Sequence, residues 1–113
     1  MPKPLRGEVW MTDFDPTRGH EQAGMRPGLV ISIDAFNAGP AELVVILPLT
    51  TREKRVRSHV PVEPPEGGLR RRSFIKCEDV RSVALERLSK RLGAISPATI
   101  EAVELRLRIL LNL

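Results

Sequence analysis

Apolar and polar positions along the chain predict a series of short strands followed by one helix. Residues 8–14 alternate well enough to form a first strand, and the apolar runs at 28–34 and 43–49 are typical of buried strands. Further short strands are predicted at 58–62, 73–77 and 91–95. Residues 80–83 extend or follow the strand at 73–77, and residues 85–90 are predicted to form a helical turn. This pattern favours a sheet built mainly from neighbouring segments.

Proline and glycine divide these elements. Turns are expected at residues 15–19 and 64–68, and residues 52–58 read as a charged loop. Pro48 has no N–H group, so we expect it at a sheet edge or a bulge near the end of the strand at 43–49.

The strongest helix signal covers residues 97–111. Ser96 is a good N-cap and Pro97 suits the first helical position. Apolar side chains recur at helical spacing, at Ile100, Val103, Leu107, Leu110 and Leu111. We therefore expect a mainly β fold, a small twisted sheet or partly open barrel with a C-terminal helix packed on it, as one domain over residues 1–113. The apolar helix favours packing within the monomer, and a homodimer is the alternative.

Composition narrows the class of protein. The chain has 113 residues, of which 42% are hydrophobic and 28% charged, which is typical of a globular domain. No apolar run has the length of a membrane helix, and the N-terminus lacks the apolar stretch of a signal peptide. Cys77 is the sole cysteine, so we expect a reducing cytoplasm. Cys77, His20 and His59 lack zinc-site spacing, and we expect no metal or cofactor.

Positive charge is concentrated in the middle of the chain. The net charge is +4, whereas residues 52–91 alone carry twelve basic and six acidic side chains. The excess lies in two basic stretches, whose members are Arg52, Lys54, Arg55 and Arg57 in the first and Arg70, Arg71 and Arg72 in the second. Such stretches favour a polyanion or an acidic protein segment, and solubility alone is the alternative.

Candidate chemistry gathers where polar residues meet predicted strands. Arg26 follows a glycine-bearing loop that contains His20 and Glu21, and Thr50 and Thr51 follow the strand at 43–49. A guanidinium fits phosphate oxygens, a hydroxyl can donate to them, and His is a natural proton shuttle. The structural alternatives are an ion pair of Arg26 with a nearby carboxylate, a turn at the threonines and a solvated loop.

A second polar group follows the strand at 73–77. Glu78 and Asp79 are flanked by Lys76 and Arg81, and in a strand the two carboxylates would point to opposite faces. Salt bridges to the basic neighbours are the default interpretation. Cys77, like the single tryptophan, Trp10, is expected in the core.

Five segments in register resemble the MazF/PemK toxins, at residues 6–10, 13–17, 19–27, 47–51 and 75–82. The resemblance implies an SH3-like barrel of the MazF/PemK/CcdB type with a C-terminal helix, forming a homodimer. It also implies the toxin of a type II toxin–antitoxin pair, a sequence-specific, metal-independent endoribonuclease that cuts single-stranded mRNA. The implied partner is a cognate antitoxin with an acidic, mostly disordered tail.

The resemblance also implies roles for individual residues. The family's catalytic arginine and threonine match Arg26 and Thr50, and the histidine of PemK-type sites matches His20. Lys76 and Glu78 fall where PemK-type toxins have arginine and aspartate, which is a departure, since lysine lacks the bidentate fork of arginine.

The reaction implied is attack of a ribose 2′-OH on the adjacent phosphorus, leaving a 2′,3′-cyclic phosphate and a 5′-OH. His20 or Glu21 would act as the base, and the two basic stretches would follow RNA phosphates. The alternatives are a CcdB-like toxin that binds gyrase and a catalytically inactive module that binds RNA or antitoxin.

Overall fold

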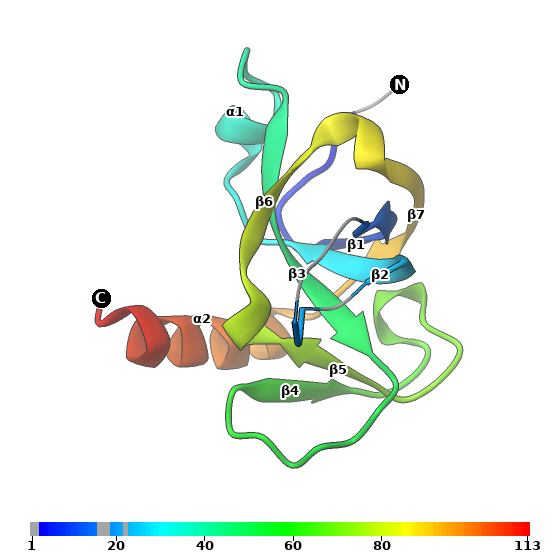
Figure 1. The fold of residues 1–113 in the computed structure, drawn as a ribbon, viewed down its shortest axis with the longest axis vertical. Coiled ribbons are helices and arrows are strands. Elements are labelled where there is room, and N and C mark those ends of the chain that lie inside the picture. The colour runs from blue at the N-terminus through cyan, green and yellow to red at the C-terminus, as the bar shows by residue number, and fades with distance from the viewer. Residues whose placement is uncertain (1–2, 16–18, 22) are drawn as a thin grey trace.

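The structure is a computed structural model that describes residues 3–15, 19–21 and 23–113. Figure 1 shows the strands curled around a core, with a helix lying across one side. The described strands are β1 (Glu8–Asp13), β2 (Met25–Val30), β3 (Leu43–Thr50), β4 (His59–Val62), β5 (Ser73–Lys76), β6 (Arg81–Ala84) and β7 (Leu88–Ala94). The helices are α1 (Asp34–Asn37) and α2 (Pro97–Leu111), with single 3₁₀ turns η1 (Glu66–Gly68), η2 (Cys77–Asp79) and η3 (Leu85–Arg87).

Every strand pairing is antiparallel, and β3 is the central strand. The strand order is β4-β5-β3-β2-β1-β7, with β6 also paired to β3. Along one side β3 pairs with β2, while its other side pairs first with β6, up to Ile46, and then with β5, from Leu49. β3 thus joins two parts of a strongly curled sheet, and the predicted mainly β fold with a C-terminal helix is confirmed.

Two apolar clusters fill the space that the strands and α2 enclose. One cluster includes Trp10 and Phe14, and the other includes Cys77 and Val103 of α2. The expected core positions of Trp10 and Cys77 are confirmed, since both are buried. Burial raises the pKa of the Cys77 thiol to about 12, so this thiol stays protonated and unreactive at neutral pH.

The sequence predicted α2 with its true bounds, because its end signals are local. The Ser96 hydroxyl accepts a hydrogen bond from the Thr99 N–H, and Pro97 occupies the first turn. Val103 is buried, whereas the last turns leave several large apolar side chains exposed, namely Leu105, Ile109, Leu110 and Leu111. Within the described residues, no helix has the length and apolar character needed to cross a membrane.

The predicted bounds of β2 and β7 were wrong. β2 begins at residue 25 rather than 28, because Met25 and Arg26 pair with Asp13 and Thr12 of β1. It ends at Val30 instead of 34, and the unpredicted helix α1 follows. Buried Asn37 holds this turn by donating to the carbonyls of Pro4 and Ser32. β7 starts at Leu88 rather than 91, because Leu88 already pairs with Thr12.

Two further local predictions were wrong in part. Pro48 is buried within the central strand, so the sheet-edge alternative is wrong. Its expected position near the end of that strand is confirmed, and it lies between the end of pairing with β6 and the start of pairing with β5. Glu78 and Asp79 lie in the 3₁₀ turn η2 rather than in a strand, so their side chains do not alternate between two faces. Residues 16–18 of the predicted turn at 15–19, and Gln22 of the loop that resembles the toxins, lie outside the described residues.

Candidate functional site

Arg26 and Thr50 lie just beyond the paired part of β2 and β3. In the β2–β3 pairing, Gly28 faces Pro48 and Val30 faces Ile46. The pairing ends at Gly28 and Pro48, and Arg26 of β2 and Thr50 of β3 each lie two residues beyond it. Because side chains two apart along a strand share a face, these two positions lie on one face of the sheet. The two side chains singled out by the sequence both line one cavity at this end of the β2–β3 pair.

A polar cavity of about 380 Å³ lies over this end of the sheet. Its lining carries the side chains of four basic residues, Arg26, Arg52, Lys54 and Lys76, together with His20, Glu21, Thr50 and Thr51. The loop before β2 supplies His20 and Glu21, and the loop after β3 supplies Arg52 and Lys54. Cations that converge on a concave surface favour an anionic ligand.

Arg26 and Thr50 are both open to a ligand. In the described part of the chain, the Arg26 guanidinium makes one long hydrogen bond, 3.4 Å from Nε to the Ala23 carbonyl oxygen, and no ion pair. The structural alternative, an ion pair of Arg26 with a nearby carboxylate, is thus wrong. Thr50 Oγ1 accepts a hydrogen bond from the Arg52 N–H at 3.2 Å, which matches the expected turn and leaves its hydroxyl hydrogen available to a ligand.

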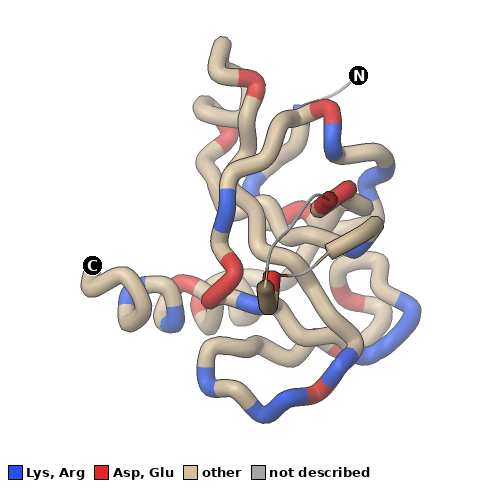
Figure 2. Tube along the Cα trace, viewed as in Figure 1, with Lys and Arg blue, Asp and Glu red and all other residues tan. Residues whose placement is uncertain are grey.

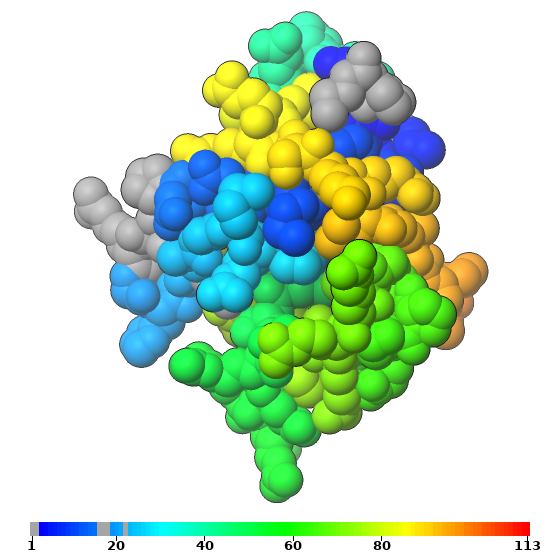
Figure 3. Space-filling view, turned by 90° about the vertical axis from the view of Figure 1, so that its right-hand side faces the viewer, coloured from blue at the N-terminus to red at the C-terminus, as the bar shows by residue number. Residues whose placement is uncertain are grey.

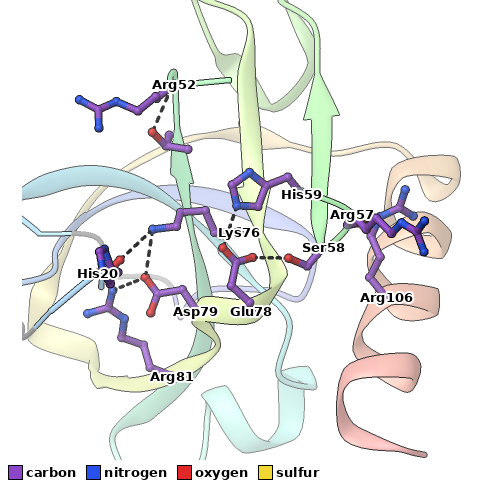
Figure 4. Close-up of polar contacts among 11 residues, drawn as sticks. His20, Arg52, Arg57, Ser58, His59, Lys76, Glu78, Asp79, Arg81 and Arg106 are labelled. Atoms are coloured by element: carbon purple, nitrogen blue, oxygen red, sulfur yellow. Dashed lines mark hydrogen bonds and ion pairs between the residues drawn. The ribbon is translucent and has the colours of Figure 1, made fainter. Parts of the chain in front are cut away.

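Lys76 is a buried cation at the floor of the cavity, and its ion-pair partner is Asp79. Its Nζ lies 3.6 Å from Asp79 Oδ2 and 3.4 Å from the carbonyl oxygen of His20 (Figure 4). Asp79 also pairs with Arg81 at 2.9 Å. The default prediction of salt bridges to basic neighbours is confirmed for Asp79. The turn η2 makes this possible, because it brings residues 76 and 79 to the same side.

Glu78 instead bonds to β4 and the loop before it. Its carboxylate accepts from Ser58 Oγ at 2.7 Å and lies 2.7 Å from His59 Nε2 (Figure 4). Burial alone would raise the pKa of Glu78, but the hydrogen bonds from Ser58 and His59 outweigh it and hold this pKa below its ordinary value. Glu78 is therefore ionised at neutral pH, and His59 donates to it.

The His59–Glu78 pair lines an adjoining cavity of about 430 Å³, which shares His20, Glu21, Lys54 and Lys76 with the first cavity. Sequence reasoning missed this pair, because its members are 19 residues apart and only the β4–β5 pairing brings them together. The alternation of polar and apolar residues at 58–62 predicts a strand that contains His59, but it does not indicate that Glu78 is its partner.

The two basic stretches do not form one patch. Figure 2 shows the first stretch along the loop after β3 and the second at the side of the molecule. Arg52 and Lys54 line the cavity, whereas Arg55 and Arg57 do not. Arg70 and Arg71 line a separate groove, and Arg72 pairs with Glu53 at 3.1 Å and Glu63 at 2.5 Å. Position along the sequence did not distinguish these three environments.

The charged groups of the site are arranged for an anion rather than for a metal ion. In the part of the chain that the structure describes, no group of three or more His, Cys, Asp or Glu side chains is placed to hold a metal ion. The cavity is instead dominated by cations, whose chemistry suits phosphate oxygens.

Known proteins resemble this chain over nearly its whole length. The model of the PemK-like, MazF-like toxins of type II toxin–antitoxin systems matches residues 5–111. Endoribonuclease MazF9 of Mycobacterium tuberculosis is 33% identical to this chain, and the alignment covers 96% of each of the two chains. Endoribonuclease PemK of Escherichia coli is also 33% identical, over 95% of this chain and 81% of PemK.

Solved structures agree with these relatives. MazF from Deinococcus radiodurans superimposes with a TM-score of 0.88 at 28% identity, covering all of both chains. MazE–MazF from the same organism matches with a TM-score of 0.81 at 29% identity, over 100% of this chain and 99% of the other. The matched family model and the curated relatives together show that the chain belongs to the PemK-like, MazF-like toxins of type II toxin–antitoxin systems.

Proposed function

We propose that this chain is an endoribonuclease toxin that cleaves single-stranded mRNA in the cytoplasm, with Arg26 and Thr50 as its catalytic pair. The observation that supports the proposal is that both residues line one cavity rich in cations. The curated relatives MazF9 and PemK are named endoribonucleases, which supports the same activity here.

The proposed reaction uses the RNA's own 2′-OH as nucleophile. Its oxygen bonds to the adjacent phosphorus as the bond to the 5′ oxygen breaks, which leaves a 2′,3′-cyclic phosphate and a 5′-OH. Negative charge builds up on the non-bridging oxygens in the transition state. Arg26 donates to these oxygens through its planar fork, and the Thr50 hydroxyl donates to one of them or orients the 2′-OH.

Two proton transfers complete the reaction. The 2′-OH loses its proton to a base, and the departing 5′ oxygen gains one. We propose His20 or Glu21 as the base, which is supported by the position of both in the cavity lining. Lys76 contributes positive charge from the cavity floor, where Asp79 and the His20 carbonyl hold its ammonium group.

Two surfaces of the chain are proposed to bind protein partners. Since a MazE–MazF structure shares this fold, we propose a cognate antitoxin whose acidic, mostly disordered tail occupies the basic cavity and excludes RNA. We also propose a homodimer that covers the exposed apolar side chains at the C-terminal end of α2, such as Ile109 and Leu110. Each assembly buries surface that the single chain exposes, apolar in the dimer and charged in the antitoxin complex.

The test is incubation of the purified protein with a long unstructured RNA in excess EDTA, followed by analysis of the product ends. We expect cleavage at a restricted set of sites, with 2′,3′-cyclic phosphate and 5′-OH ends. A DNA of the same sequence should stay intact, because it has no 2′-OH. Intact RNA that is nevertheless tightly bound would overturn the proposal in favour of an inactive binding module, and cleavage with 3′-OH ends would overturn the mechanism.

A further inference from the structure

A groove of about 530 Å³ lies beside the cavity just described. One wall consists of β1, β2 and β7, and the other of η1 and the segment from Leu69 to Ser73. Figure 3 faces the surface where these segments meet, with the first two strands in blue and cyan, the η1 segment in green and β7 in orange. The volume lies within the range of roughly 300–1,000 Å³ that is typical of small-ligand sites.

The strand wall is fixed by the register of three strands. Met11 of β1 pairs with Pro27 on one side and with Lys90 on the other. All three residues therefore stand in one row across the sheet, and all three line the groove. Leu92 extends this wall. The row offers an apolar surface with a cation at one end.

The opposite wall is held close to β7 by a glycine contact. Gly68 has a φ of +68°, and a Cβ there would lie 1.9 Å from the carbonyl oxygen of Leu92. Such an approach requires glycine at this position, because the atom it would meet is backbone. η1 thus packs directly on β7, and the groove is a preformed feature of the fold.

The groove carries cations that are not neutralised. Among the residues that the structure describes, no carboxylate pairs with Arg70, Arg71 or Lys90, all of which line the groove. Arg72, the next residue in sequence, lies outside the lining and pairs with Glu53 and Glu63. Unpaired guanidinium groups beside an apolar wall suit a ligand with both a phosphate and a base, because guanidinium binds the phosphate and stacks on the base.

The groove is continuous with the candidate catalytic cavity. Thr51, the residue after β3, lines both. The groove residue Pro27 is next to Arg26 in β2 but on the opposite face of the strand, so the two concave surfaces meet at Thr51. An RNA strand whose scissile phosphate lies at Arg26 and Thr50 would therefore pass Thr51 and reach the groove with an adjacent nucleotide.

We propose that this groove is a subsite for a nucleotide that flanks the scissile phosphate. The base of that nucleotide lies on Met11, Pro27 and Leu92, and its phosphate is held by Arg70 and Arg71. This inference rests on the proposed endoribonuclease function and adds to it, since the groove makes cleavage depend on a nucleotide outside the reacting pair.

The test uses an oligonucleotide built around a cleavage site mapped on the long RNA. Four further versions of the oligonucleotide each lack one base, at one of the two positions on either side of the scissile phosphate. Cleavage of all versions is measured with the wild type, with an Arg70→Gln/Arg71→Gln variant and with an Arg72→Gln control. Losing one flanking base should lower kcat/KM of the wild type about tenfold. The double variant should be slower on the intact oligonucleotide and insensitive to that base, while the Arg72→Gln control should behave as the wild type.

Binding of the same oligonucleotide, made uncleavable by a 2′-deoxyribose at the scissile position, measures how many phosphates the groove neutralises. The magnitude of the slope of log K against the logarithm of the salt concentration should fall by about 0.7 for each phosphate that the double variant no longer neutralises. The slope of the control should not change. Met11→Ala should reduce the sensitivity to the flanking base without changing the salt dependence. Thermal unfolding of each variant verifies that the fold is retained.

Other outcomes separate the two proposals. If the wild type cleaves RNA but the double variant keeps both the base sensitivity and the salt dependence, the subsite is refuted and the endoribonuclease stands. If the double variant loses affinity for a poly-glutamate peptide while its RNA binding is unchanged, the groove serves a protein partner and the subsite is likewise refuted. If the wild type cleaves no RNA, both proposals fall.

Discussion

Replacing Arg26 by alanine should separate the stability of the fold from the proposed chemistry. The Arg26 side chain is exposed, its one hydrogen bond is long, and within the described residues it has no ion pair. Removing it leaves no buried group without a partner. We therefore expect the free energy of unfolding to change by no more than about 0.5 kcal/mol, as for an ordinary surface position.

The effect on cleavage should be far larger. In the proposed transition state Arg26 donates to non-bridging oxygens whose charge is increasing, and loss of one such donor costs about 10²–10³ in rate, or roughly 2.7–4 kcal/mol. Arg26→Lys should fall between the wild type and Arg26→Ala, because it keeps the charge but loses the planar fork. The expected loss of transition-state stabilisation is therefore at least about five times the expected change in the free energy of unfolding.

The assay is single-turnover cleavage with saturating protein, which isolates the chemical step, alongside urea unfolding of the same samples. Arg72→Ala is the matched control, since it removes an arginine from the surface but not from the cavity lining. A rate of Arg26→Ala within about threefold of the wild type would refute the catalytic assignment. A slow variant that is also destabilised by several kcal/mol would refute the claim that the side chain acts on substrate rather than on the fold.

Three further results are expected. Thr50→Val keeps the shape of the side chain but removes the hydroxyl, so single-turnover cleavage should fall about 10²-fold with little change in unfolding; a near-native rate would place the donor elsewhere. Burial raises the pKa of Glu66, but hydrogen bonds from Thr99 and Ser96 outweigh this and hold the pKa below its ordinary value. Its ionised form therefore stabilises the fold above about pH 4.5, and that stabilisation is lost as pH falls through the lowered pKa. Glu66→Gln should lower the free energy of unfolding by about 1–2 kcal/mol at pH 7 and by progressively less in acid. A difference between wild type and variant that stays constant from pH 7 to pH 3 in urea unfolding would contradict this. Val103→Ala deletes two methyl groups from a side chain that is 1% exposed and should cost about 2 kcal/mol in the same assay, whereas a cost below about 0.5 kcal/mol would mean that α2 packs loosely.

Elements with local signals were predictable from the sequence. The apolar run at 43–49 became β3, and the cap and apolar spacing at 96–111 became α2, each within one residue of its predicted bounds. The limits of β2 were not local. Arg26 belongs to the strand because β1 pairs with it, and β2 ends at Val30 because Asn37 ties the turn that follows to Pro4. Pairing and buried polar contacts cannot be read from periodicity.

The candidate site shows the same division. The resemblance selected Arg26 and Thr50, and both line the same cavity in the structure. The resemblance also matched Lys76 and Glu78 to an arginine and aspartate that act together. In the structure the turn η2 instead brings Lys76 to an ion pair with Asp79, and Glu78 to a hydrogen bond with His59. Which carboxylate a buried ammonium meets depends on backbone geometry over four residues. Residue types alone predict a strand there, and a strand would give these side chains the wrong directions.

The distribution of unpaired cations, rather than the net charge of +4, decides where an RNA strand binds. Arg72 lies between Glu53 and Glu63, so its charge is largely neutralised before any ligand arrives. Arg70, Arg71 and Arg26 have no such carboxylate in the part of the chain that the structure describes, so counterions associated with them can be displaced by phosphates. The basic run at 70–72, uniform in sequence, therefore divides into two residues available to a polyanion and one that holds the surrounding loops together.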